Sequence, residues 1–145
     1  MAAAETDLLR VEGLTVAFPG PVAVVGGVSF SLGRGEMVGL VGESGCGKTM
    51  TALALMRLLP AAARRAGGAA HLRCRGDDAS RDLLALPEDE MRALRGSAVA
   101  MIFQEPMTAL NPVMSVGEQI GEMLEIHTDM GATERRRRVI EAMGD

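Results

Sequence analysis

The stretch that decides the fold is Met37–Thr49, MVGLVGESGCGKT, in which a short apolar run leads into a glycine-rich loop. Its last eight residues match the pattern GxxxxGK[ST]. In this pattern the glycines let consecutive backbone N–H groups converge on phosphate oxygens, and the following helix adds the positive end of its dipole. Lys48 supplies a compact charge for the β and γ phosphates, and the Thr49 hydroxyl can ligate magnesium. The motif therefore predicts a nucleotide-phosphate loop.

Chance is a poor explanation for this match. The chain holds 18 glycines but only one lysine, so a random sequence of this composition has about 0.001 expected matches to the pattern. The 14 other basic residues are all arginines. A crowded loop of backbone amides favours a compact ammonium over a planar guanidinium, which explains why Lys48 is the exception.

The segments that flank the loop have the order that a phosphate loop requires. Met37–Val41 is a near-continuous apolar run, typical of a strand buried on both faces of a parallel sheet. Lys48–Leu59 has apolar residues at helical spacing, and Pro60 is expected to stop that helix. The sequence thus predicts strand, loop and helix in succession.

Upstream of the loop, two segments alternate apolar with other residues. Leu8–Phe18 and Val22–Leu32 both have this period of two, and the turn residues Gly33–Glu36 follow the second segment. We predict an antiparallel pair of half-buried strands.

Downstream, the pattern is more broken. Ala61–Ala70, AAARRAGGAA, is expected to be flexible, and His71–Arg75 to be a short exposed strand. Pro87, followed by three acidic residues, predicts the first turn of a short helix. Ala98–Phe103, AVAMIF, predicts a second apolar strand, followed by a polar loop over Gln104–Pro112.

Two helices are expected near the end of the sequence. Ser115 and Glu118 have the spacing of a capping box, so a helix is predicted to begin there and to run to about Ile126. Thr133 marks the start of a last helix, which runs to near Asp145.

Composition excludes several classes of protein. The 145 residues suit one domain, and the net charge of −4 argues against a polycation that binds nucleic acid. Phe18, Phe30 and Phe103 are the only aromatic residues, so platforms for stacking single-stranded bases are missing. No apolar run is long enough for a membrane span, and the start lacks the features of an export signal, which predicts a cytosolic protein. Cys46 and Cys74 form no CxxC pair, so a thiolate metal site is not expected.

Two runs of sequence resemble a known family. VGLVGESGCGKT from Val38, together with RALRGSAVAMIFQEPMTALNPVMSVGEQI from Arg92, is similar to the ATP-binding subunits of ABC transporters. Within them it most resembles the dipeptide/oligopeptide (or nickel) importer group. The second run is long and non-repetitive, so it is more specific than the loop alone. The resemblance extends from about Leu8 to the end.

The resemblance implies roles for individual residues. The loop becomes the Walker A motif, and Gln104 falls at the Q-loop glutamine, which in the family reaches the magnesium and the attacking water. Phe18 falls where the family keeps an aromatic that stacks on adenine. The catalytic candidates are Lys48 and Gln104, and the magnesium ligands are Thr49 and Gln104. The expected residues for binding ATP and Mg²⁺ are Phe18, Gly42, Glu43, Ser44, Gly45, Cys46, Gly47, Lys48, Thr49 and Met50.

The resemblance also implies an architecture. The expected fold is α/β, a P-loop NTPase (RecA-like) core with an N-terminal antiparallel β portion, truncated before the signature and Walker B segments. Residues 1–145 would form a partial nucleotide-binding domain. Its expected parts are a β portion and phosphate-loop core over about 8–60, an arm over about 61–97, a Q-loop strand and loop over 98–112, and the start of a helical subdomain over 113–145.

The expected partners follow from the same family. They are membrane permease subunits, a second ATP-binding subunit and, indirectly, a solute-binding protein, with no nucleic acid. The helical segment after Pro112 would dock against the permease. The protein would be peripheral, on the cytoplasmic side of the cell membrane, and would couple ATP hydrolysis to the import of peptides or similar solutes.

Several of the family's motifs are not found in these residues. The LSGGQ signature, the Walker B strand with its Asp and catalytic Glu, the D-loop and the switch His would all follow Asp145. Leu83–Glu90, LLALPEDE, imitates a Walker B tail, but Pro87 and its place before Gln104 favour a helix start. His71 and His127 precede the place of the switch His. We therefore expect these residues to bind Mg-ATP without turning it over.

Two other interpretations stay open. One is a different phosphate-loop protein, such as a nucleotide kinase or a GTPase, although no NKxD guanine motif is found. The other is a truncated remnant with no nucleotide function.

Overall fold

The computed structural model describes residues 7–20, 22–74, 79–105 and 110–144. The chain divides into two compact units, Met1–Arg92 and Ala93–Asp145, and each is described by itself. The elements are, in order, β1 (Asp7–Ala17), β2 (Ala23–Gly33), α1 (Lys48–Leu55), β3 (Arg64–Leu72), β4 (Arg81–Asp82), α2 (Glu88–Leu94), α4 (Val116–His127) and α5 (Ala132–Gly144).

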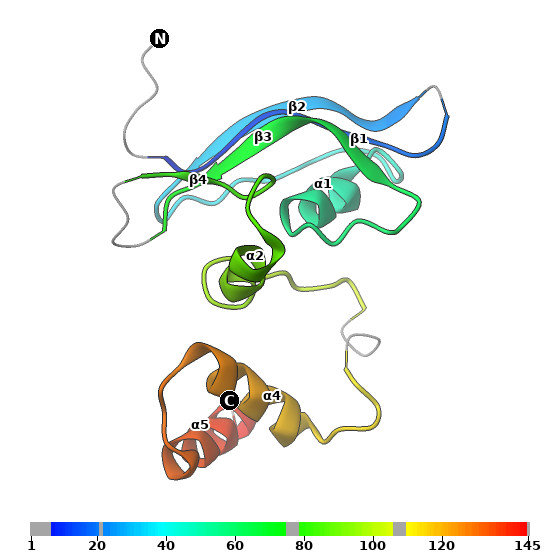
Figure 1. The fold of residues 1–145 in the computed structure, drawn as a ribbon. Coiled ribbons are helices and arrows are strands. Elements are labelled where there is room, and N and C mark those ends of the chain that lie inside the picture. Colours follow the sequence, from blue (N-terminus) through cyan, green and yellow to red (C-terminus); the bar gives the residue numbers. More distant parts are fainter. Residues whose placement is uncertain (1–6, 21, 75–78, 106–109, 145) are drawn as a thin grey trace. The chain divides into compact units, whose positions relative to one another are not determined.

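The first unit is built on an antiparallel sheet with strand order β2-β1-β3-β4 (Figure 1). The predicted antiparallel pair is confirmed: β1 pairs with β2 from Asp7↔Gly33 to Ala17↔Ala23. Helix α1 contacts both of these strands. The core is apolar, and its most deeply buried side chains are Val11, Leu14, Val16, Leu83 and Met91.

The predicted flexible stretch over Ala61–Ala70 is wrong, because Arg64–Leu72 is strand β3. This strand pairs with the central strand β1 and buries Ala70 and Leu72 against it. The glycines serve close packing: a Cβ on Gly68, whose φ is +93°, would lie 2.6 Å from the backbone nitrogen of Leu14. A composition that is typical of a linker here permits two strands to approach each other.

Helix α1 ends earlier than predicted, at Leu55 rather than Leu59. Arg57 adopts a φ of 54°, the left-handed conformation of a helix C-terminal cap. The N–H of Leu58 donates to the Leu53 carbonyl at 2.8 Å and the N–H of Arg57 to the Ala54 carbonyl at 3.0 Å, which is the Schellman pattern. The helix therefore stops through its own backbone before Pro60 acts.

The predicted strands Met37–Val41 and Ala98–Phe103 are not strands in this structure. The side chains of Met37, Val41 and Ile102 are 94–96% exposed. A buried parallel strand needs hydrogen-bonded neighbours and cover on both faces. Among the described residues, the only β-bridge that includes either segment is the isolated one between Arg95 and Val99.

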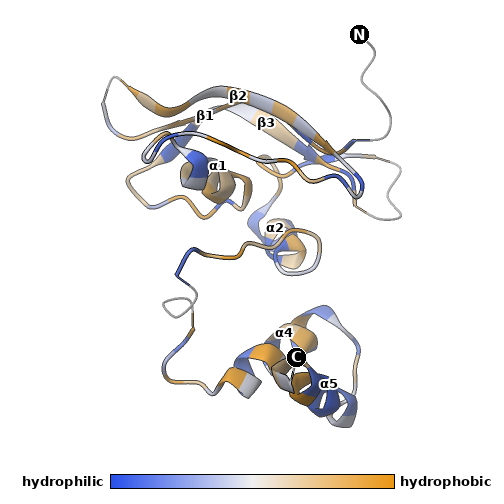
Figure 2. Ribbon diagram, turned by 180° about the vertical axis from the view of Figure 1, so that it is seen from behind, coloured by the Kyte–Doolittle hydropathy of each residue, from blue (hydrophilic) through white to orange (hydrophobic). Residues whose placement is uncertain are grey.

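The second unit contains the helices α4 and α5. The capping box is confirmed: Ser115 Oγ accepts from the Glu118 N–H at 3.2 Å, and the Glu118 carboxylate accepts from the Ser115 N–H at 2.8 Å. The two helices pack where Val139 lies over Gly117 and Gly121. In Figure 2 much of the ribbon of α5, which carries four consecutive arginines, has the blue of hydrophilic residues.

Candidate phosphate-binding site

The loop before α1 is backed by strand β2 at one glycine. Gly47 is buried and has a φ of +93°, and a Cβ added to it would lie 2.6 Å from the Val24 carbonyl oxygen and 3.0 Å from Val25 Cγ2. A side chain would therefore be both strained and blocked by backbone. Only glycine lets the chain turn into the helix this close to the sheet.

A few hydrogen bonds hold the loop in shape. The Cys46 N–H donates to the Glu43 carbonyl at 3.4 Å, and both the N–H and the hydroxyl of the buried Thr51 donate to the Gly47 carbonyl, at 2.8 and 3.0 Å. In the part of the chain that the structure describes, the N–H groups of Gly45, Gly47 and Lys48 have no acceptor. Such N–H groups at the start of a helix suit an anion.

Lys48 is bound back onto the loop. Its Nζ donates to the carbonyl oxygens of Gly42 and Glu43, both at 2.7 Å, and lies 3.6 Å from Cys46 Sγ. Within residues 7–20, 22–74, 79–105 and 110–144, no carboxylate pairs with it. Neutral carbonyls thus position the ammonium without cancelling its charge, which leaves it available to a phosphate.

Gly42 opens the loop and lies beside the Cys46 side chain. A Cβ there would lie 2.5 Å from Cys46 Sγ, so the thiol occupies the space that a side chain at position 42 would need. The thiol is itself exposed. Thr49, in the first turn of α1, is also exposed, and its hydroxyl is accessible to a ligand.

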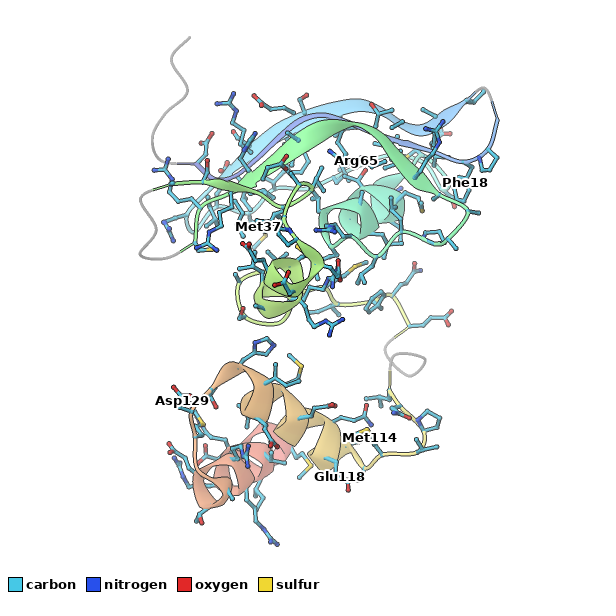
Figure 3. The ribbon with its side chains drawn as sticks, in the orientation of Figure 1. Phe18, Met37, Arg65, Met114, Glu118 and Asp129 are labelled. Atoms are coloured by element: carbon cyan, nitrogen blue, oxygen red, sulfur yellow. The ribbon has the colours of Figure 1, made fainter. Side chains whose placement is uncertain are left out.

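Phe18 lies at the same end of the sheet as the loop. It follows the last residue of β1, Ala17, which is paired with Ala23, and the next two residues of β2 are those that contact Gly47. Its side chain is half-buried, so part of the phenyl ring is accessible (Figure 3). The structure thus brings together the loop and the aromatic residue that sequence reasoning singled out separately.

Gln104 lies in the second unit, in irregular backbone after Phe103, and its side chain is exposed. Its assignment as a magnesium ligand stays a prediction.

Sequence reasoning missed the start of β3 at this site. The register pairs Ala17 with Arg64 and Val16 with Arg65, which places two arginines beside the end of β1. The apolar residues Ala70 and Leu72, two positions apart, could have indicated a strand, but the neighbouring glycines are typical of a flexible segment.

Two kinds of feature are absent from the described residues. No helix there is long and apolar enough to cross a membrane. No group of three or more His, Cys, Asp or Glu side chains there could hold a metal ion.

Comparison with known proteins then places the sequence among relatives. The family model described as "ABC transporter" matches residues 25–145. The chain is 44% identical over 140 residues to a probable peptide ABC transporter ATP-binding protein, y4tR, of Sinorhizobium fredii, covering 94% of this chain and 40% of that protein. It is 48% identical over 130 residues to the oligopeptide transport ATP-binding protein OppD of Escherichia coli, covering 88% and 36%.

A third relative is the glutathione import ATP-binding protein GsiA of Shigella flexneri, 48% identical over 139 residues, with 88% of this chain and 21% of that protein covered. The chain thus spans between about a fifth and two fifths of the length of these relatives.

Among solved structures, the chain is similar to the ATP-binding cassette MJ0796 in a dimeric, post-hydrolysis state bound to ADP and Pi. The TM-score is 0.72 at 21% identity, over 94% of this chain and 56% of that one. At this identity the likeness shows the fold, which is the P-loop fold with an N-terminal antiparallel β portion expected from the sequence.

Proposed function

This chain belongs to the ABC transporter family, and from that premise we propose that Gly42–Thr49 binds the phosphates of ATP in the nucleotide-binding subunit of an importer. The observation that carries the proposal is the position of Lys48 Nζ, 2.7 Å from two loop carbonyls and unpaired with any carboxylate of the described residues. An incoming phosphate would gain this ammonium and the unpaired N–H groups of the loop.

The base would stack on Phe18. The ring is half-buried, and β2 links it to the loop at one end of the sheet. A phenyl face suits a purine, and the phosphates would then extend from β1 toward Gly47. This arrangement would place the base and the phosphates of ATP, the ligand expected from the sequence, at one end of the sheet.

The residues present also fit a magnesium ion. The Thr49 hydroxyl is exposed beside Lys48, and oxygen donors of this kind are those that magnesium prefers. Thr49 would hold the ion, and Gln104 stays the second ligand that the family resemblance predicts. When bound, the ion would supply charge neutralisation of the β and γ phosphates.

The relatives suggest the transported solute and the partners. Their names specify peptide, oligopeptide and glutathione transport, so we propose a peptide-type solute for this chain. The proposed partners are a second ATP-binding subunit, membrane permease subunits and, indirectly, a solute-binding protein. The proposed location is the cytoplasmic face of the membrane.

For the 145 residues alone we propose binding without turnover. The sequence supplies groups that position and neutralise phosphates but neither a catalytic Glu nor a signature motif. Coupling hydrolysis to import would require those groups from elsewhere.

Calorimetric titration with Mg-ATP tests the proposed function. Removing the only lysine with Lys48→Ala should weaken binding at least about tenfold, because a charge-assisted contact to phosphate is lost. The matched control is Arg92→Ala, which removes an exposed cation on α2 and should leave the affinity unchanged. Equal binding by Lys48→Ala and the unchanged chain would contradict the proposal and favour a remnant without nucleotide function.

A further inference from the structure

Strand β3 places an arginine on the sheet face that covers the phosphate loop. Val16 of β1 is directly opposite Val25 of β2 on one side and Arg65 of β3 on the other. Directly paired residues of antiparallel strands share a face of the sheet. Val25 Cγ2 would lie 3.0 Å from a Cβ on Gly47, so this is the face turned toward the loop. Arg65 lies on the same face, two strands away.

We place Phe18, the residue after the end of β1, on the same face. Side chains alternate along an extended strand, so the residue two positions after Val16 returns to its side. Phe18 and Arg65 are then diagonal neighbours across β1 and β3, with Cα atoms about 7–8 Å apart, within reach of an aromatic and a long side chain. Figure 3 labels both residues at this sheet.

The guanidinium of Arg65 is held by one hydrogen bond to its own strand, toward Gly68 and away from the Phe18 end of the sheet, and stacking on a base would require it to leave this partner. Its Nη1 donates to the Gly68 carbonyl at 2.8 Å, which uses one of its five N–H donors. The side chain is exposed, and among the residues described no carboxylate pairs with it. From Ser44 to Gly76 the sequence has six Lys and Arg residues and no Asp or Glu. No nearby anion in the sequence therefore competes for this cation.

We propose that Arg65 is a further nucleotide-binding residue, whose guanidinium stacks on the purine face opposite Phe18. This inference rests on the proposed function, because it takes the phosphates to lie at Gly42–Thr49. With the phosphates near β2 and the phenyl ring at the end of β1, the base lies toward β3. A guanidinium plane stacks on an aromatic face, whereas the ammonium of lysine does not present a plane.

A contact between Arg65 and phosphate is the competing role, and ligand choice separates the two. Inorganic triphosphate carries the phosphate charge without a base. A stacking residue contributes to the binding of ATP alone, while a phosphate-binding cation contributes to both ligands. Lysine can replace arginine as a charge but not as a stacking plane.

The test is calorimetric titration of Mg-ATP and of magnesium triphosphate into the 145-residue chain and its variants. Arg65→Ala should weaken Mg-ATP binding about tenfold, the range of a desolvated cation–π contact, and leave triphosphate binding unchanged. Arg65→Lys should fail to restore ATP binding. The matched control is Arg64→Ala, which removes the same charge from the adjacent residue on the opposite face.

The outcomes separate this inference from the proposed function. Equal losses for ATP and triphosphate with Arg65→Ala, or rescue by Arg65→Lys, would overturn base stacking. Unchanged ATP binding in Arg65→Ala, with binding lost in Lys48→Ala, would overturn the role of Arg65 and leave the phosphate loop intact. Circular dichroism spectra that match those of the unchanged chain confirm that each variant is folded.

Discussion

At the scale of single residues, two of the three glycines in the loop, Gly45 and Gly47, differ in what they contribute. Gly45 and Gly47 both have positive φ, 84° and 93°. A Cβ on Gly45 would meet nothing within 4 Å, whereas one on Gly47 would lie 2.6 Å from the Val24 carbonyl oxygen. Position 45 thus requires only a left-handed backbone, while position 47 also requires the space next to β2.

This difference predicts unequal costs for alanine. Gly45→Ala should lower the free energy of unfolding by about 1 kcal/mol through backbone strain. Gly47→Ala should lower it by about 3 kcal/mol, because overpacking against the backbone adds to the same strain. Urea unfolding followed by circular dichroism measures both changes. Equal costs would show that the Val24 carbonyl moves aside freely.

The loop pattern specifies Gly47 but leaves position 45 open, and it does not indicate that Gly47 lies against β2. It specifies backbone conformation and phosphate chemistry, which are local. The approach of Val24 depends on how β2 passes the loop, a contact between segments more than twenty residues apart. Lys48 shows the same limit: the motif predicts its charge, whereas its two carbonyl partners become known only from the fold.

At the scale of elements, helix α4 carries a titratable cap. Hydrogen bonds from the Ser115 hydroxyl and from the Ser115 N–H lower the pKa of the Glu118 carboxyl below its usual 4.5. A carboxyl whose pKa is lower in the folded state stabilises the fold fully above the unfolded pKa, and this contribution is lost as pH falls through the folded value. The first turn of α4 should therefore loosen below pH 4.5.

NMR chemical shifts of residues 116–120 between pH 6 and pH 2 measure this effect, since they report local helix content. The shifts should move toward random-coil values as the carboxyl takes up its proton. In Ser115→Ala the helical shifts should already be smaller at pH 6 and should change less on acidification, because the hydroxyl partner is gone. An unaltered titration in that variant would contradict the cap mechanism.

Elements with local end signals could be predicted from the sequence, and those without could not. The capping box places the start of α4 within one residue, and the acidic first turn places α2. Strand β3 has no such signal, because its stability comes from pairing with β1, whose partner residues lie from 47 (Ala17↔Arg64) to 63 (Leu9↔Leu72) positions away in the chain. The end of α1 was predicted too late because a non-glycine residue, Arg57, forms the left-handed cap, and arginine gives no sequence signal for that conformation.

At the scale of the whole chain, two apolar segments lack the neighbours that their composition requires. Met37–Val41 and Ala98–Phe103 are uncharged and free of proline, and Ile102 is 95% exposed. These near-continuous apolar runs are typical of buried parallel strands. A parallel strand is stable only between partners, and the described residues pair neither segment into a sheet. Composition here predicts a requirement for burial, not the burial itself.

Exposed segments of this kind favour strand-to-strand association between molecules. We therefore expect the 145-residue chain to self-associate at micromolar concentration, with or without ATP, as measured by sedimentation velocity. Ile102→Lys should suppress this association by placing a charge in the AVAMIF segment. The matched control is Ile126→Lys: Ile126 is also exposed, at 63%, but it lies in the helix α4 and not in an extended segment. Suppression by Ile126→Lys and not by Ile102→Lys would place the association on the helices instead, and association that requires ATP would indicate the subunit pairing proposed for the family.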